Sequence, residues 1–162
     1  MRVWTRDGRI VAVGLLDGPD LLRLTVAPSS RRDTALADRL VADLADPAHG
    51  VLPTGRWAVE TPNGTLVQAR LTQSGWGTGE SWTPLRRDLT APVDRPALGV
   101  LPEHRRQGHG RAICVAAAAV LQELGSSSVL VCTESTRVAA IATYESAGFE
   151  RLPPRRDRIR AA

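Results

Sequence analysis

Short apolar segments near the N-terminus are separated by turn residues, and this pattern is typical of β-strands. The turn Asp7-Gly8 joins Met1–Thr5 to Arg9–Leu16, which predicts a hairpin. A second cluster of turn residues precedes Leu21–Val26, which predicts a further strand.

The spacing of apolar residues then changes to that of a helix. Asp33–Leu44 carries a one-sided apolar stripe, and Asp33 is a suitable N-cap. A short strand is expected at Arg56–Glu60. The segment Thr65–Trp76 fits either the second arm of a hairpin that turns at Asn63-Gly64 or a helix that ends at Gly75.

The second half of the chain begins with Gly75–Pro96, which is rich in Gly, Thr and Pro and is expected to be a connector. Periodicity and turn residues then predict an alternation of strands and helices. The expected elements are a strand at Ala97–Leu101, a helix at Gly110–Leu124, a buried strand at Ser128–Cys132, a helix at Thr136–Ala147 that ends at Gly148, and a last strand or tail from Phe149.

Two segments of the chain resemble each other. Leu24–Arg32 matches Leu98–Arg106 at five positions, which are one Leu, one Val, one Pro and two consecutive Arg. Each copy precedes a helix, a strand and a candidate helix. The copies close on Gly75-Trp76 and Gly148-Phe149, which favours a helix at 65–74. We therefore predict an internal repeat with units at 1–80 and 97–162, joined by a connector at 81–96, that together form one compact body.

Composition excludes several classes of protein. With 162 residues, 43% hydrophobic and 23% charged, the chain is globular. The apolar run Ala112–Leu121 is too short to span a membrane, and the N-terminus lacks an export signal, so a cytoplasmic protein without a membrane partner is expected. Cys114 and Cys132 form no cluster with each other or with His, so neither a disulfide scaffold nor a metal site is expected.

The net charge of +4 raises the question of nucleic acid. Every one of the 21 basic residues is Arg. This bias is typical of a GC-rich genome, and we prefer that interpretation to nucleic-acid binding.

The segment from Val100 to Arg111 carries the clearest chemistry. It runs from an expected strand through a tight loop into a helix, and Gly108 and Gly110 lack side chains where the helix begins. Backbone N–H groups there, with Arg105 nearby, would suit a pyrophosphate. The loop has neither the GxxxxGK[ST] nor the GxGxxG pattern. A plain turn before an Ala-rich helix is the alternative.

Arg105-x-x-Gly108-x-Gly110 resembles motif A of the GCN5-related N-acetyltransferases (GNAT), and Tyr144-x-x-x-Gly148-Phe149 is similar to their motif B. The resemblance covers Leu98–Leu152, about a third of the chain. It implies an α/β fold with a mixed sheet flanked by helices. The first copy is similar to a degenerate motif A, with Thr34 and Leu36 at the glycine positions, and is not expected to bind a cofactor. Such a pair resembles the tandem GNAT proteins of actinobacteria.

The resemblance also implies roles for particular residues. Tyr144 falls at the general-acid position, although a ring that packs the helix on the sheet is the alternative. Asp94 is the candidate base, with Glu134 or water as alternatives. The residues expected to hold acetyl-CoA, the co-substrate, are Val100, Arg105, Arg106, Gln107, Gly108, His109, Gly110 and Arg111. Among them His109 is interpreted as a spacer.

The sequence departs from the family in two ways. Arg137 stands where motif B commonly has Asn, and 75–96 is too short for the elements that normally precede motif A. The first unit or a second copy in a homodimer would then complete the sheet. We expect an N-acetyltransferase that passes acetyl from acetyl-CoA to a primary amine of a small molecule or peptide by direct attack. The alternative is a non-catalytic module that binds acyl-CoA or self-associates.

Overall fold

The computed structural model describes residues 1–93 and 109–161, which divide into two compact units. The first unit consists of residues 1–80 together with the C-terminal segment from Arg156. The second consists of Ser81–Arg155. Each unit is described by itself, and the expectation of one compact body stays a prediction.

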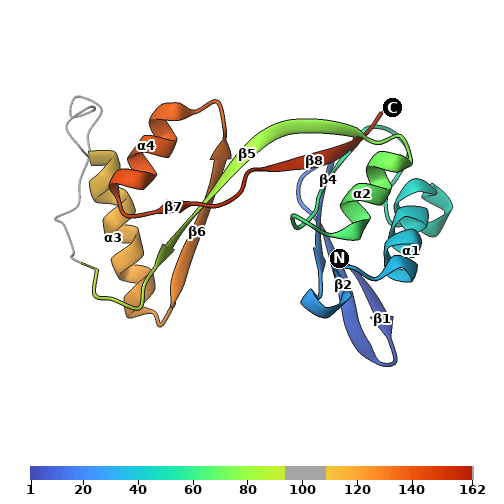
Figure 1. The fold of residues 1–162 in the computed structure, drawn as a ribbon, viewed down its shortest axis with the longest axis horizontal. Coiled ribbons are helices and arrows are strands. Elements are labelled where there is room, and N and C mark those ends of the chain that lie inside the picture. Colours follow the sequence, from blue (N-terminus) through green and yellow to red (C-terminus); the bar gives the residue numbers. More distant parts are fainter. Residues whose placement is uncertain (94–108, 162) are drawn as a thin grey trace. The chain divides into compact units, whose positions relative to one another are not determined.

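The first unit is built on a mixed sheet (Figure 1). The expected N-terminal hairpin and the two later strands are confirmed to within a residue or two. In sheet order the strands are β1 (Arg2–Arg6), β2 (Arg9–Leu16), β3 (Leu21–Val26), β4 (Trp57–Glu60), β8 (Arg155–Arg160) and the start of β5 (Gly77–Asp88). In this sheet β1 with β2, β2 with β3, and β4 with β8 pair antiparallel, and β3 with β4 pair in parallel.

Two helices cover one face of this sheet, α1 (Thr34–Ala45) and α2 (Leu66–Gln73). The Asp33 carboxylate accepts a hydrogen bond from the Leu36 N–H at 2.9 Å, which confirms the expected N-cap. Helix α2 settles the alternative left open at 65–74, and Gly75 ends it at a φ of +86°. The buried core joins side chains of both helices to strand residues such as Trp4, Leu22 and Val59. Short 3-10 turns lie at Pro28–Ser30 and Pro47–His49.

The second unit pairs the rest of β5 antiparallel with β6 (Ser128–Glu134) and with the short β7 (Glu150–Arg151). Helices α3 (His109–Glu123) and α4 (Val138–Ser146) confirm the two expected helices. The strand expected at 97–101 lies outside the described residues. A core of Leu85, Val115, Ile141, Ala147 and Phe149 joins the strands to the helices.

Two expectations for this unit are wrong. Residues 81–88, expected in the connector, lie within the 12-residue strand β5, in which Thr83 and Leu85 alternate with more exposed neighbours. Strand β6 is not buried on both faces, because Leu130 is 64% exposed and Cys132 is also exposed. The apolar composition of β6 resembled that of a buried strand, but only one of its faces packs against the core.

The same arrangement of elements occurs in both units. Each has a helix, a strand, a second helix and then a Gly-aromatic pair whose glycine has a positive φ. In the first unit β8 lies between β4 and β5, and in the second unit β5 lies between β6 and β7. The middle strand therefore comes from a distant part of the chain in each case. The sequence repeat itself stays a prediction, since its second copy falls largely outside the described residues.

Candidate functional site

The structure describes part of the predicted site, all of it in the second unit. His109, Gly110 and Arg111 form the start of α3, and Tyr144 lies on α4. Asp94, Val100 and the residues Arg105, Arg106, Gln107 and Gly108 lie outside the described residues. Their predicted roles stay predictions.

Helix α3 packs closely against α4 at Gly110. A Cβ atom at position 110 would lie 2.9 Å from Cγ2 of Thr143, which is closer than side-chain atoms normally approach. Thr143 is stiff because it is β-branched, and its hydroxyl already donates to the Ala139 carbonyl at 2.8 Å. Gly110 therefore has a packing role between two helices, which the sequence pattern alone did not indicate.

Arg111 also joins the two helices. Its Nε donates a hydrogen bond to the Ser146 carbonyl at 2.7 Å. Ser146 ends α4, where carbonyl groups lack partners within the helix. Arg111, predicted to contact the co-substrate, thus fixes the start of α3 against the end of α4.

The start of α3 fits an anion. The helix has 15 residues and no acidic residue in its first turn, so nothing within that turn offsets the positive end of the helix dipole. His109 is the first helical residue and is half-buried. An anionic group of a substrate is the kind of ligand that such a helix start favours.

The Tyr-x-x-x-Gly-Phe ending forms the C-terminus of α4. The Phe149 N–H donates to the Tyr144 carbonyl at 3.1 Å, and Gly148 adopts a φ of +83° that glycine tolerates best. The rings of Tyr144 and Phe149 meet with centroids 5.7 Å apart at 60°. Tyr144 is partly buried against the core, and its hydroxyl forms no hydrogen bond with the described residues. The Tyr144 ring therefore takes part in the packing of α4.

The candidate base Glu134 has a partner nearby. Arg137 donates from its Nε to the Glu134 carboxylate at 3.0 Å, and this hydrogen bond raises the pKa of Arg137. Arg137 occupies the N-cap position of α4 without capping it through its side chain. The arginine at the usual Asn position is thus an ion-pair partner for Glu134.

A hollow that the sequence did not indicate lies beside the end of α4. It encloses about 360 Å³ and is lined by Arg86, Arg87, Asp88, Gly148, Glu150 and Leu152. Arg87 donates to the Ala147 carbonyl at 2.6 Å. Arg86, Arg87 and Asp88 were not predicted to line a hollow, because a connector and not a strand was expected at 81–96. The lining mixes both signs of charge, so it indicates no ligand class.

Neither a metal site nor a membrane-spanning helix is found in residues 1–93 and 109–161. Within them, no group of three His, Cys, Asp or Glu side chains is placed to hold a metal ion. No helix in the same ranges is long and apolar enough to cross a membrane.

Comparison with known proteins shows what the second unit is similar to. Residues 81–151, a little under half of the chain, match the model of the acetyltransferase (GNAT) domain. The fold is similar to the crystal structure of a GCN5-related N-acetyltransferase from Sphaerobacter thermophilus, with a TM-score of 0.55 and 14% identity. That match covers 95% of this chain and 78% of the other, so it includes residues of both units. No curated protein matches the sequence.

Proposed function

Because residues 81–151 match the model of the acetyltransferase (GNAT) domain, we propose that the protein transfers an acetyl group from acetyl-CoA to a primary amine. GNAT domains generally use acyl-CoA, which supports a thioester as the donor. The family match is the observation that carries the proposal. The start of α3, which has no acidic residue in its first turn, supports it further.

In the proposed reaction the amine nitrogen attacks the thioester carbonyl carbon. A C–N bond forms, the C–S bond breaks, and the nitrogen loses a proton to a base or to water. The sulfur that leaves as a thiolate takes a proton from the Tyr144 hydroxyl. A phenol suits this step because it is protonated at neutral pH, and its pKa of about 10 lies close enough to the pKa of about 8.5 of a thiol for the proton to pass to the leaving thiolate.

The packing of Tyr144 supports its proposed role as the general acid. Contact with Phe149 restricts the ring, while the hydroxyl makes no hydrogen bond with the described residues. A restricted ring loses less conformational freedom when it meets the leaving group. Asp94 is the proposed base, and Glu134 is less suitable because Arg137 holds it in an ion pair.

Binding of the donor is tested by calorimetry with acetyl-CoA. Arg105→Gln removes an arginine of the proposed loop, and Arg31→Gln removes its counterpart in the first copy as a matched control. We expect Arg105→Gln to weaken binding by about tenfold or more, as the loss of a charge-assisted hydrogen bond does, and Arg31→Gln to leave it unchanged. No binding by the natural protein, or equal losses in both variants, contradicts the proposal.

A substitution at Gly110 is a poor probe of the loop, because any side chain there meets Thr143. Tyr144→Phe is a cleaner probe of chemistry. It keeps the ring contact with Phe149 and removes only the hydroxyl. We expect thiol release with a panel of small amines and peptides to slow by about a hundredfold, with acetyl-CoA affinity unchanged.

A second candidate function is a non-catalytic module that binds acyl-CoA or self-associates. The ion pair between Glu134 and Arg137 favours this second candidate, because it engages the carboxylate of one candidate base. Arg137 also stands where the family commonly has Asn. Tight binding of acetyl-CoA without thiol release to any amine of the panel would establish this candidate. Light scattering would then show whether a homodimer forms.

A further inference from the structure

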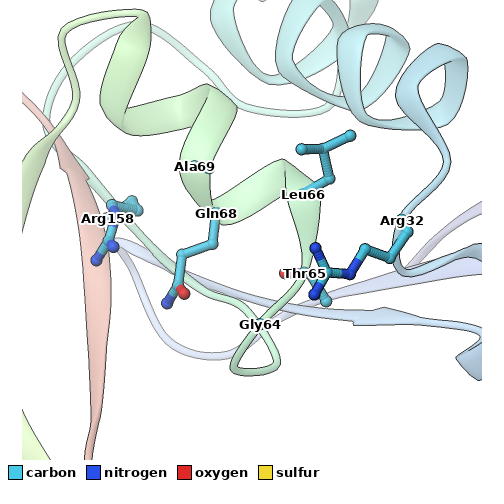
Figure 2. Close-up of a pocket in the computed structure, with 7 residues that line it drawn as sticks. All are labelled: Arg32, Gly64, Thr65, Leu66, Gln68, Ala69 and Arg158. Atoms are coloured by element: carbon cyan, nitrogen blue, oxygen red, sulfur yellow. The ribbon is translucent and has the colours of Figure 1, made fainter.

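The first unit contains a cavity of about 330 Å³ at the start of α2 (Figure 2). Arg32, from the turn before α1, lies at one side, and Arg158, from β8, lies at the other. The chain from Gly64 to Ala69 forms the wall between them, with the Gln68 side chain beside Arg158. A volume of this size accommodates a small metabolite.

Among residues 1–93 and 109–161, the lining includes no carboxylate. The ionisable residues of that described lining are Arg32 and Arg158. Arg32 forms no ion pair or hydrogen bond with residues 1–93 and 109–161. Several other arginines of the same unit are paired, as Arg23 is with Glu60 and Arg70 is with Asp38, whereas Arg31 also has no ion pair with the described residues. Arg32 is therefore a cation directed at the cavity rather than at a neighbouring acid.

Arg158 is held in place by neutral groups alone. Its Nε donates to the Thr72 hydroxyl at 2.8 Å, and an Nη donates to the carbonyls of Arg156 and Asp157 at 3.0 and 3.4 Å. Partial burial lowers the pKa of Arg158, and the charge of Asp157 offsets this only in part. A guanidinium that is partly removed from water gains most from a charged acceptor.

The start of α2 adds to this field. No side chain caps the helix, because the Thr65 hydroxyl donates instead to the Pro62 carbonyl at 2.8 Å. The positive end of the helix dipole therefore acts in the same direction as the two arginines. Gln68 adds a side-chain amide that can donate to or accept from a ligand.

We propose that this cavity binds a small organic dianion, with one acidic group at Arg32 and the other at Arg158. Two carboxylates, or a carboxylate and a phosphate, supply this chemistry, because guanidinium groups form charge-assisted hydrogen bonds to both, and one Nη of Arg158 has no partner among the described residues. The placement of the arginines at opposite sides favours a ligand with two acidic ends over a single small ion. The residues that line the site belong to the first unit, whereas the loop proposed to hold acetyl-CoA belongs to the second.

The test is calorimetry on the full chain at constant ionic strength with succinate, 3-phosphoglycerate and acetate. We expect both dianions to bind and acetate to bind at least about tenfold more weakly, since it reaches one arginine. Tighter binding of succinate identifies a dicarboxylate site, and tighter binding of 3-phosphoglycerate identifies a phosphorylated acid. Failure of both dianions to bind, or equal affinity for acetate, overturns the proposal.

Variants locate the binding in this cavity. Arg32→Gln is expected to weaken binding of the better dianion by about tenfold or more. Arg31→Gln is the control, because it makes the same change of net charge at a neighbouring residue that lines another surface. Gln68→Glu places a carboxylate inside the cavity, so we expect it to abolish dianion binding and to raise the thermal midpoint. Equal effects of the two Arg→Gln variants, or unchanged binding by Gln68→Glu, contradict the assignment.

Discussion

The guanidinium of Arg160 lies over the indole ring of Trp76, with its Cζ 5.7 Å from the ring centroid. The same group donates to the carbonyl of Leu44, in the last turn of α1, at 2.9 Å, and to that of Gly55 at 3.1 Å. A third hydrogen bond goes to the Pro53 carbonyl. One side chain of β8 thus joins a helix C-terminus, the loop before β4 and the ring that precedes β5.

Replacing Arg160 by Gln should destabilise the first unit. The change removes a cation over an aromatic ring and three hydrogen bonds, of which the one to Leu44 is partly buried, and together they contribute about 1–3 kcal/mol. The measurement is urea unfolding followed by circular dichroism. Arg156→Gln is the control, since exposed Arg156 donates a single long hydrogen bond within the described part of the chain, at 3.3 Å to the Gly79 carbonyl. Equal midpoints for the two variants would show that Arg160 has no special role.

Truncation after Arg155 should unfold the first unit while the second keeps its structure. The cut removes β8, which pairs with all of β4 except Glu60, so the β4 amides lose their partners on that side. Hydrogen exchange is the measurement. We expect exchange to accelerate in Trp57–Val59 and remain slow in α3 and α4. A chain that ends at Arg160 is the control, and protection of β4 in the shorter chain would contradict the prediction.

Gly110→Ala should destabilise the protein even though alanine favours helices by about 1 kcal/mol over glycine. The new methyl group would meet Cγ2 of Thr143, and such overpacking costs about 1–3 kcal/mol. Thr143→Ser removes that methyl group and keeps the hydroxyl that donates to Ala139.

A double-mutant cycle by thermal unfolding provides the measurement. We expect Gly110→Ala to become neutral or stabilising when Thr143→Ser is present. Additive effects of the two substitutions would mean that the close approach of the helices does not limit the residue at 110.

Asp33 should contribute to the loss of stability in acid. A hydrogen bond from Arg6, followed by that from the Leu36 N–H, lowers the pKa of the Asp33 carboxyl below its ordinary value of 3.8. A carboxyl group with a lowered pKa stabilises the fold above its ordinary pKa, and the contribution disappears as the pH falls through the folded-state value. Asp33→Asn should therefore lower the thermal midpoint at neutral pH and lessen its decline in acid. A parallel decline in both proteins below pH 3.8 would exclude this role.

Local signals made much of the fold predictable. The turn at Asp7-Gly8 and the cap at Asp33 specify the elements beside them, and both appear as expected. Strand β5 was missed because its Gly, Thr and Pro residues resemble a loop, and Pro84 is unusual in a strand. Its conformation depends on pairing with β6 across the register Pro84↔Cys132, and local sequence does not encode that pairing.

The candidate site divides in the same way. The ending at Tyr144, Gly148 and Phe149 was recognised because a helix C-terminus has a local pattern. The contacts of Gly110 with Thr143 and of Arg111 with Ser146 join residues that are distant in sequence, so no local spacing predicted them. Arg32 and Arg158, which line the cavity of the first unit, are distant in sequence, and only the fold brings them together.

The position of β8 has a consequence for the order in which the protein matures. Residues 1–80 leave the ribosome first, yet their sheet lacks the strand between β4 and β5 until Arg155–Arg160 has been synthesised. The second unit is continuous along the chain and can close earlier. The first unit is therefore translated before the second but completed after it. Until β8 has been synthesised, the edge of the sheet at Trp57–Glu60 is open and has to be kept from pairing with other strands.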